Sequence, residues 1–342
     1  MISPYNPEPM PELYYAAACQ TDFPSPTHRG EIAARTQRMC QMIEQTIVGY
    51  EPFFDVRLLV FPEFSHAVPA YESASALLEK LAIEVPNAHT DQYHRLAKKY
   101  GCYIQTGTFL ECDPAYPGMV FNTTVLVGPA GVLLKYRKVN PWLPWEVHTS
   151  PHDIEDYEGA LFPVADTELG KLGVAICFDW LFPEVLRQLT FNGAEVLIRL
   201  SAYMDPWGAM PPMDWWTLFN RARAAENTAY VVAANQGASL EHYPPFSWPG
   251  GSMVVDFDGR ILAQADPGPG EKVVVGPIDI RQLRDERARR VGHDMRAQLR
   301  SEAYDYLAEP RLARAAAADH PLRSESLRKR IAAAKKPRPG RA

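Results

Sequence analysis

Three residues with reactive side chains stand where apolar, strand-like stretches of the sequence end. Cys177 follows the apolar run Leu172–Ile176 and precedes a helical pattern that opens at "FPE". Glu63 closes "LLVFPE", and Lys138 lies within "LLKYRKVNPW" after an alternating stretch. Open α/β sheets place their ligand sites at the carboxyl ends of strands. A thiol, a carboxylate and an ammonium group are therefore candidates for a common site.

The chemistry these residues suggest is nucleophilic attack by sulfur, which needs a base because free cysteine has a pKa near roughly 8.5. No Cys–His signature accompanies Cys177. Taken singly, each of the three residues has a structural explanation. A buried cysteine is usually a small apolar filler, and a glutamate or lysine at a strand end is usually a solvated charge. The case for chemistry depends on the sequence around them.

The three residues lie in three blocks, "LLVFPEF", "KYRKVNPWLPWE" and "GVAICFDWLFPE". These blocks resemble, in order and spacing, the three motifs of the nitrilase superfamily of carbon–nitrogen hydrolases. The resemblance covers most of residues 14–280 and includes "FNTTVLVGPAG" and "RARAAENTAYVVAANQG". Within the superfamily, "EVLIRLSAYMDPW" and the spacing of eight between Lys138 and Glu146 are most similar to the aliphatic amidase and formamidase branch.

The resemblance implies a role for each matching residue. Glu63 matches the general base, Cys177 the nucleophile and Lys138 the lysine that stabilises the oxyanion. Glu146 matches the second glutamate of the amidases, which would orient the amide and the attacking water. The backbone N–H of Phe178 would complete the oxyanion hole. We therefore expect an amidase that forms a cysteine thioester, uses water as its second substrate and requires no metal or organic cofactor.

The residues after the nucleophile bear on the substrate. Relatives that cleave N-carbamoyl amino acids place arginines there to hold a carboxylate, whereas this chain has Trp180 and Leu181. A neutral monoamide is therefore the expected substrate. Two alternatives stay open: a nitrile, although nitrilases tend to have "CWE" where this chain has "CFD", and a neutral carbamoyl or ureido compound.

Aromatic residues are plentiful near the motif blocks and are candidates for an apolar acyl pocket. Ordinary core and subunit packing explains several of them equally well. Phe64 stands where close relatives often have a tyrosine, which removes a possible hydroxyl contact with the substrate. The pocket candidates are Phe64, Trp142, Trp145, Trp180, Tyr203 and Trp207.

Strand-like and helix-like segments alternate along the chain, which is typical of an α/β domain. The resemblance implies the four-layer α-β-β-α sandwich of the superfamily, followed by a C-terminal helical extension. The clearest segments are strands at 14–23 and 56–64, helices at 31–47, 90–101 and 183–192, and a hairpin that turns at Asp258-Gly259.

Charge is spread unevenly over the 342 residues, whose net charge is −6. Residues 1–280 contain 18 basic and 33 acidic side chains (−15), and residues 281–342 contain 17 and 8 (+9). We expect a hydrolase domain over 1–280, an arm over 281–330 that packs on a neighbouring subunit, and a disordered tail over 331–342. A basic arm also suggests nucleic-acid binding, but acidic residues are mixed throughout it and no nucleic-acid motif is visible. We expect a homodimer or a larger even oligomer.

Composition and cysteine usage bear on the compartment. No segment approaches the roughly 18 apolar residues of a membrane span, and the start of the chain lacks the pattern of a secretory signal. The five cysteines are widely spaced and contain no CxxC pair, which favours reduced thiols. A cytoplasmic protein without a membrane partner is expected.

Two other motifs have weaker claims. His148, His152 and Asp153 resemble a metal-ligand cluster, but Pro151 places them in a loop, and we expect no metal site. Asn122 lies in "NTT", a glycosylation acceptor pattern, within a predicted strand. Glycosylation is not expected there.

Overall fold

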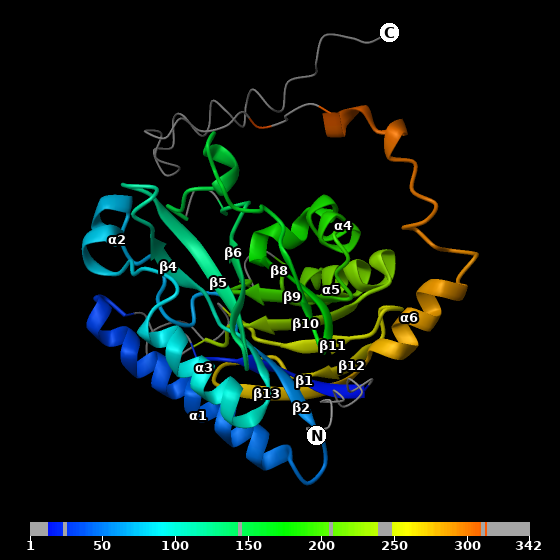
Figure 1. Ribbon diagram of the computed structural model, residues 1–342, viewed down its shortest axis with the longest axis horizontal. Coiled ribbons are helices and arrows are strands. Elements are labelled where there is room, and N and C mark those ends of the chain that lie inside the picture. Colours follow the sequence, from blue (N-terminus) through cyan, green and yellow to red (C-terminus); the bar gives the residue numbers. More distant parts are fainter. Residues whose placement is uncertain are drawn as a thin grey trace, which may run out of the picture.

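The computed structural model of the chain describes residues 13–22, 26–142, 146–204, 208–238, 248–308 and 312 (Figure 1). Two β-sheets lie against each other, and helices cover their outer faces (Figure 1). The predicted four-layer α-β-β-α sandwich is confirmed. Among the described helices, none has both the length and the apolar character needed to cross a membrane.

The first sheet combines strands from both ends of the described chain. Its order is β13-β1-β2-β3-β5-β4, with β6 paired to β5. β1 runs parallel to β2 and antiparallel to β13, so the last strand closes against the first. The strands are β1 (Leu13–Gln20), β2 (Val56–Val60), β3 (Tyr103–Gln105), β4 (Phe109–Cys112), β5 (Val120–Gly128), β6 (Gly131–Arg137) and β13 (Lys272–Asp279).

The second sheet has the order β12-β11-β10-β9-β8-β7. Its central strands β8, β9 and β10 are parallel and carry nearly continuous apolar runs, as expected of strands covered on both faces. Their carboxyl ends therefore meet at one edge. The strands are β7 (Val164–Thr167), β8 (Gly170–Ile176), β9 (Val196–Ser201), β10 (Tyr230–Asn235), β11 (Met253–Val255) and β12 (Ile261–Gln264).

Different helices form the two outer layers of the sandwich. α1 and α3 cover the first sheet, and α4 and α5 cover the second (Figure 1). A shared core lies between the sheets, and a separate core lies between the first sheet and its helices. The helices are α1 (Ile32–Tyr50), α2 (Ala74–Lys80), α3 (Ala88–Tyr100), α4 (Pro183–Phe191), α5 (Trp215–Asn227) and α6 (Ile280–Arg289).

Local sequence explains where α3 begins and ends. The side chain of Asn87 accepts hydrogen bonds from the backbone N–H groups of His89 and Thr90 at the helix start. Gly101 follows the last turn with φ 61°, a left-handed conformation in which a side chain would be strained. The sequence predicts this helix over 90–101, and the structure begins it two residues earlier because the cap lies at Asn87.

Two predicted strands end earlier than the apolar pattern indicates. The strand predicted over 56–64 ends at Val60, so Glu63 lies in the loop beyond β2. The strand predicted over 14–23 ends at Gln20. In the first case the early end allows the chain to turn, and Phe64 adopts a positive φ of 61°.

The C-terminal region begins on the body of the protein. α6 buries Ile280 and Leu283, and Arg284 pairs with Glu195 at 2.7 Å. Residues 290–308 then continue along the outside of the body (Figure 1), where Arg290 pairs with Asp258 and the Tyr306 hydroxyl donates to Glu184 of α4. Within the predicted arm, α6 thus packs on its own subunit. The predicted tail over 331–342 lies outside the described residues.

Candidate active site

Cys177 lies at an abrupt turn between β8 and α4. It begins a short 3-10 helix, Cys177–Leu181, and its φ is +45°, an uncommon conformation for a residue with a side chain. Such strained positions are enriched at functional sites. The residue is 9% exposed, so its thiol is largely shielded from bulk water.

A buried carboxylate holds this turn in place. Asp179 accepts hydrogen bonds from the backbone N–H of Ile176 at 2.9 Å and from the hydroxyl of Tyr136 at 2.7 Å. Its other oxygen accepts from the backbone N–H and the side-chain amide of Asn140, at 2.9 and 3.0 Å. Asn140 lies two residues after Lys138. The carboxylate therefore ties the Cys177 turn to the segment that carries Lys138.

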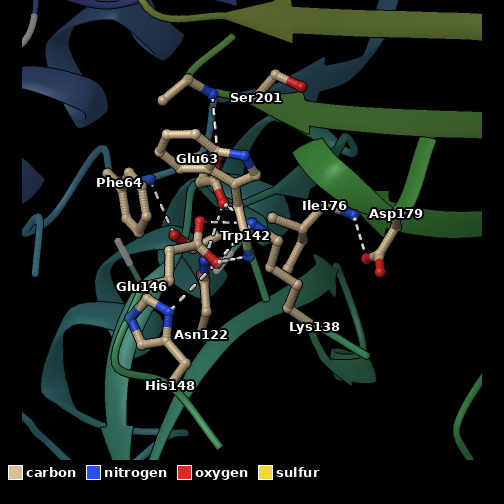
Figure 2. Close-up of polar contacts among 12 residues, drawn as sticks. Glu63, Phe64, Asn122, Lys138, Trp142, Glu146, His148, Ile176, Asp179 and Ser201 are labelled. Atoms are coloured by element: carbon tan, nitrogen blue, oxygen red, sulfur yellow. Dashed lines mark hydrogen bonds and ion pairs between the residues drawn. The ribbon is translucent and has the colours of Figure 1, made fainter. Parts of the chain in front are cut away.

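Lys138 lies between two carboxylates in the interior (Figure 2). Its Nζ donates to Glu63 Oε1 at 2.7 Å and to the two oxygens of Glu146 at 2.6 and 2.9 Å. All three residues are at most 2% exposed. The structure thus brings together Glu63, Lys138 and Glu146, which come from three separate parts of the sequence.

Glu63 receives two further donors. The side-chain amide of Asn122 on β5 reaches Oε1 at 2.9 Å, and the backbone N–H of Ala202, just after β9, reaches Oε2 at 3.0 Å. Burial raises the pKa of Glu63; Lys138 opposes this rise, and the charge of Glu146 adds to it. The resulting pKa lies above the ordinary value for glutamate, which suits a group that accepts a proton near neutral pH.

Glu146 has the opposite electrostatic character. Its Oε2 accepts from the backbone N–H of Trp142 at 2.9 Å, and His148 Nδ1 lies 3.6 Å away (Figure 2). Although burial alone raises it, the pKa of Glu146 is lowered to about 2 by Lys138 and His148. The two carboxyl groups are thus pushed in opposite directions, as is common where one acts in proton transfer and the other stays ionised.

Cys177 lies in the electrostatic field of this cluster. Burial is the main cause that raises the pKa of its thiol, and the carboxylate of Glu63 raises it further, while Lys138 lowers it. The resting sulfur is therefore a thiol, and it needs a base to become a nucleophile. A thiol on a fixed turn, in the electrostatic field of two carboxylates and an ammonium group, can attack a carbonyl-like carbon as a nucleophile.

The predicted pocket residues lie in different surroundings. Phe64 is 2% exposed, next to Glu63, and its ring centre is 6.0 Å from that of His148. Trp142 is half-buried, and Tyr203 is buried with its ring centre 6.3 Å from that of Trp216. Trp180 is fully buried, and its indole N–H donates to the carbonyl of Ala175. Trp145 and Trp207 lie outside the described residues. A role for these residues in a pocket stays a prediction.

Phe178, whose backbone N–H is the predicted oxyanion donor, directly follows Cys177 in the turn. Its side chain is half-buried and packs edge-on against Phe182, with ring centres 5.1 Å apart. Its position next to the sulfur fits the predicted use of its N–H, which also stays a prediction.

Several residues of the site have no individual signal in the sequence. Asn122 appears there as a glycosylation pattern and within the resembling stretch "FNTTVLVGPAG" but without a role in the site, yet it is buried and donates to Glu63. In the sequence Asp179 is simply part of a motif block. Its four hydrogen bonds in the structure show that it ties the Cys177 turn to the segment after Lys138. Among the described residues no group of three His, Cys, Asp or Glu side chains is placed to hold a metal ion, and His148 instead lies beside Glu146.

Comparison with known proteins places the chain among carbon–nitrogen hydrolases. The family model described as carbon-nitrogen hydrolase matches residues 15–288. A formamidase of Bacillus cereus (strain B4264) is 34% identical over 265 residues, which span 76% of this chain and 72% of that protein. The residues matched by the family model include Glu63, Lys138, Glu146 and Cys177.

Solved structures with the same architecture include relatives of the nitrilase superfamily. Saccharomyces cerevisiae Nit3, a member of branch 10 of that superfamily, is 26% identical with a TM-score of 0.66, over 82% of this chain and 95% of its own. A mutant of the amidase from Nesterenkonia sp. AN1, whose structure shows covalent addition of the acetamide moiety of fluoroacetamide at the active-site cysteine, is 18% identical with a TM-score of 0.61. That match covers 85% of this chain and 95% of the other, and it supports the shared fold.

Proposed function

The chain belongs to the carbon–nitrogen hydrolase family, within the nitrilase superfamily, and on that premise we propose that it hydrolyses a neutral monoamide to a carboxylic acid and ammonia. The reaction would proceed through a thioester on Cys177. One observation carries the proposal: Lys138 is held between Glu63 and Glu146 in a buried cluster whose charges act on the Cys177 thiol. The formamidase relative favours an amide over other carbon–nitrogen compounds.

Acylation would begin with transfer of the thiol proton of Cys177 to Glu63. The sulfur then bonds to the amide carbon, and the carbonyl oxygen becomes an oxyanion that Lys138 and the backbone N–H of Phe178 stabilise. Glu63 returns the proton to the amide nitrogen. The carbon–nitrogen bond breaks, ammonia leaves, and the acyl group remains on the sulfur as a thioester.

Deacylation would use the same carboxylate. Glu63 accepts a proton from water, and the hydroxide oxygen attacks the thioester carbon. Lys138 again stabilises the oxyanion. Collapse of the intermediate breaks the carbon–sulfur bond, and the proton on Glu63 returns to the Cys177 sulfur. The carboxylic acid is released and the thiol is restored, so no metal or organic cofactor takes part.

Glu146 would remain ionised throughout, because its pKa is low. Two contacts support a positioning role: its oxygens accept from Lys138 Nζ and from the backbone N–H of Trp142. A fixed carboxylate at this place can accept a hydrogen bond from the amide N–H₂ of the substrate and later from the attacking water.

The proposed acyl group is apolar or aromatic. Trp180 and Leu181 follow the nucleophile, where an arginine would be expected for a carboxylated substrate. The aromatic residues near the site, Phe64, Trp142 and Tyr203, offer apolar surface for an acyl group. Nitriles and neutral ureides are the alternative substrates, since the same residues can attack a nitrile or carbamoyl carbon.

A matched substrate panel tests this proposal. Pairs of aliphatic and aromatic amides, their nitriles and the corresponding neutral ureides would be incubated with the enzyme, and ammonia release would be measured. We expect the highest kcat/KM for an amide. A nitrile or ureide preferred by tenfold or more over its matched amide would contradict the assignment.

We also propose that the protein is a homodimer or a larger even oligomer. Four apolar residues on or near α4 and α5 are 39 to 56% exposed: Phe191, Met213, Trp215 and Leu218. Where such residues gather into a patch, they mark an interaction site. Residues 291–307, which follow the body, would reach across to the second subunit, and their Val291 is 85% exposed.

A cytoplasmic location is part of the same proposal. All five cysteines are free thiols in the structure, and none is paired in a disulfide. A reducing compartment preserves the nucleophilic thiol that the reaction requires.

A further inference from the structure

Arg199 is a buried cation close to the active site that the proposed reaction does not use. It lies on β9 and is fully buried. Its Nε donates to Ser201 Oγ at 3.1 Å, and its Nη1 donates to Asn220 Oδ1 at 2.8 Å. Both partners are neutral. The third nitrogen, Nη2, has no hydrogen-bond partner among the residues that the structure describes.

Three aromatic rings surround the guanidinium. Its central carbon lies 4.3 Å from the ring centre of Trp216, 5.2 Å from that of Tyr203 and 5.3 Å from that of Trp180. Aromatic faces stabilise a cation without neutralising it. Burial lowers the pKa of Arg199 only to about 10, so the group stays positively charged at neutral pH.

The strand register places this charge next to the nucleophile. In the parallel pair of β8 and β9, Ala175 lies opposite Arg199 and Ile176 opposite Leu200. Cys177, the next residue, begins the turn just beyond this pairing, and Ser201 is the last residue of the neighbouring β9. The contact between Arg199 Nε and Ser201 Oγ shows that the guanidinium extends forward to the end of this strand.

The buried charges of the site leave a role for a second cation. With all three groups ionised, Glu63, Lys138 and Glu146 together carry a net charge of −1, and transfer of the thiol proton to Glu63 moves one negative charge from that carboxylate to the Cys177 sulfur. Lys138 is shared by two carboxylates. The guanidinium of Arg199 balances the excess negative charge without forming an ion pair of its own.

The other charged groups near the turn already have hydrogen-bond or ion-pair partners. Asp179 is surrounded by four hydrogen-bond donors. Arg223 donates to the carbonyls of Trp180 and Leu181, and it pairs with Glu226 at 3.0 Å. Tyr203 is kept neutral because burial raises its pKa to about 12. Within the described part of the chain, Arg199 is the buried cation beside Cys177 whose hydrogen-bond partners are all neutral.

We propose that Arg199 is a positioning residue for the reaction, whose uncompensated charge stabilises the thiolate form of Cys177 from beneath the nucleophile turn. This inference rests on the proposed role of Cys177 as nucleophile. Lys138 would then serve mainly the oxyanion and the two carboxylates, while Arg199 serves the sulfur. The two cations approach the reacting centre from different strands.

The test is the pH dependence of alkylation of Cys177 by iodoacetamide, followed by mass spectrometry of the peptide that contains it. Arg199→Met removes the charge, and Arg199→Lys retains it. Asn220→Asp keeps the arginine and places a carboxylate of the same shape against Nη1. We expect Arg199→Met to raise the midpoint of alkylation by about one pH unit or more. Asn220→Asp should raise it in the same direction, and Arg199→Lys should restore most of the wild-type midpoint.

The design separates an electrostatic role from a merely structural one. Arg199→Met and Arg199→Lys both remove the contacts of the guanidinium, so a purely structural role for Arg199 predicts the same midpoint in both variants. Arg260→Met is the matched control: it also removes one arginine charge, but from a side chain that is 71% exposed, and it should leave the midpoint unchanged. Thermal unfolding would confirm that each variant is folded.

Two results would overturn the inference. One is an unchanged midpoint in a folded Arg199→Met or Asn220→Asp variant. The other is a wild-type midpoint that moves when chloride replaces gluconate at constant ionic strength, because a bound anion would then already neutralise the guanidinium. Alkylation does not require turnover, so its pH profile reports on Arg199 even if a Cys177→Ala variant shows that the proposed reaction is wrong.

Discussion

Three donors surround the carboxylate of Glu63 and favour its ionised form in a place where burial favours the neutral acid. They are Lys138 Nζ, the amide of Asn122 and the backbone N–H of Ala202. The balance between burial and these contacts leaves a pKa above the ordinary value. Glu63 can therefore accept a proton and return it, which a strongly stabilised carboxylate does poorly.

Asn122→Ala removes one of these donors and should slow the reaction. A hydrogen bond to a charged group contributes about 1.5–3 kcal/mol, so kcat/KM should fall by roughly 10- to 100-fold. The acid limb of the pH–rate profile should also move to higher pH, because the ionised form of Glu63 loses a hydrogen-bond donor that stabilises it and its pKa rises. Asn192→Ala, an exposed asparagine that donates to the carbonyl of Phe162, serves as the control. Equal rates for the Asn122 variant and the wild type would argue against the role of Glu63 as base.

Glu146→Gln should shift the acid limb of the pH–rate profile to lower pH. The negative charge of Glu146 raises the pKa of Glu63, so its removal lowers that pKa. In the proposed mechanism activity requires ionised Glu63 and rises with pH through its pKa, so the acid limb of kcat/KM should move down by about one pH unit. The maximal rate should fall as well, since a contact to substrate and water is lost. A limb that moves upward would contradict the proposed coupling of the two carboxylates.

The short 3-10 helix after β8 depends on Asp179 rather than on helix propensity. The four donors on its carboxylate come from the end of β8, from β6 and from the segment after Lys138. Lys138 and the sulfur are thus held in register by a residue that touches neither. A buried carboxylate that is fully hydrogen-bonded in this way can fix geometry without taking part in the reaction.

Asp179→Asn keeps the shape of the side chain but turns an N–H₂ group toward existing donors. Each donor left unsatisfied costs about 1–3 kcal/mol, so the free energy of unfolding should fall by about 2 kcal/mol or more. The rate should fall because the Cys177 turn loses its anchor to Asn140. Urea unfolding and ammonia release would measure the two effects. A variant with normal stability and normal rate would show that backbone geometry alone sets the turn.

The order and type of the main elements follow from the sequence, while the edges and contacts of the site do not. The continuous apolar runs predict the strands β8 to β10, and the helical periodicity predicts α1 and α3. Glu63 and Lys138, however, read as ends of strands, and only the early end of β2 at Val60 turns Glu63 into the interior. Donors such as Asn122 and Ala202 come from distant strands, and a single sequence does not show which strands meet.

Beyond single elements, the charge distribution divides the molecule into an acidic body and a basic C-terminal region. α6 belongs to the body, because Arg284 and Arg287 contact Glu195 and the carbonyls of Ala194 and Thr228. Residues after 290 contribute little to the core: Met295, Tyr304 and Leu307 are 43 to 53% exposed. A boundary near residue 290 therefore suits the structure better than one near 280, and the extent of the arm stays a proposal.

Truncation after Arg290 should weaken the oligomer while leaving the folded body intact. The removed segment exposes aromatic and apolar side chains that need a partner surface, whereas α6 and its ion pairs remain. Light scattering with size exclusion would report a smaller species or a concentration-dependent mixture, and circular dichroism would report the fold. An oligomer of unchanged size would contradict the proposed role of the arm. Truncation after Ile280 is the comparison, and it should destabilise the body itself because Leu283 and the Arg284–Glu195 pair are lost.

The expected effects on the reaction rate assume that the Cys177 sulfur performs the attack. The most direct measurement is the rate of ammonia release by Cys177→Ala on the best amide of the panel, with folding checked by thermal unfolding. Removal of a nucleophile should lower kcat by about 10⁴-fold or more. A folded Cys177→Ala variant that releases ammonia within tenfold of the wild-type rate would show that the reaction does not pass through a thioester at this residue.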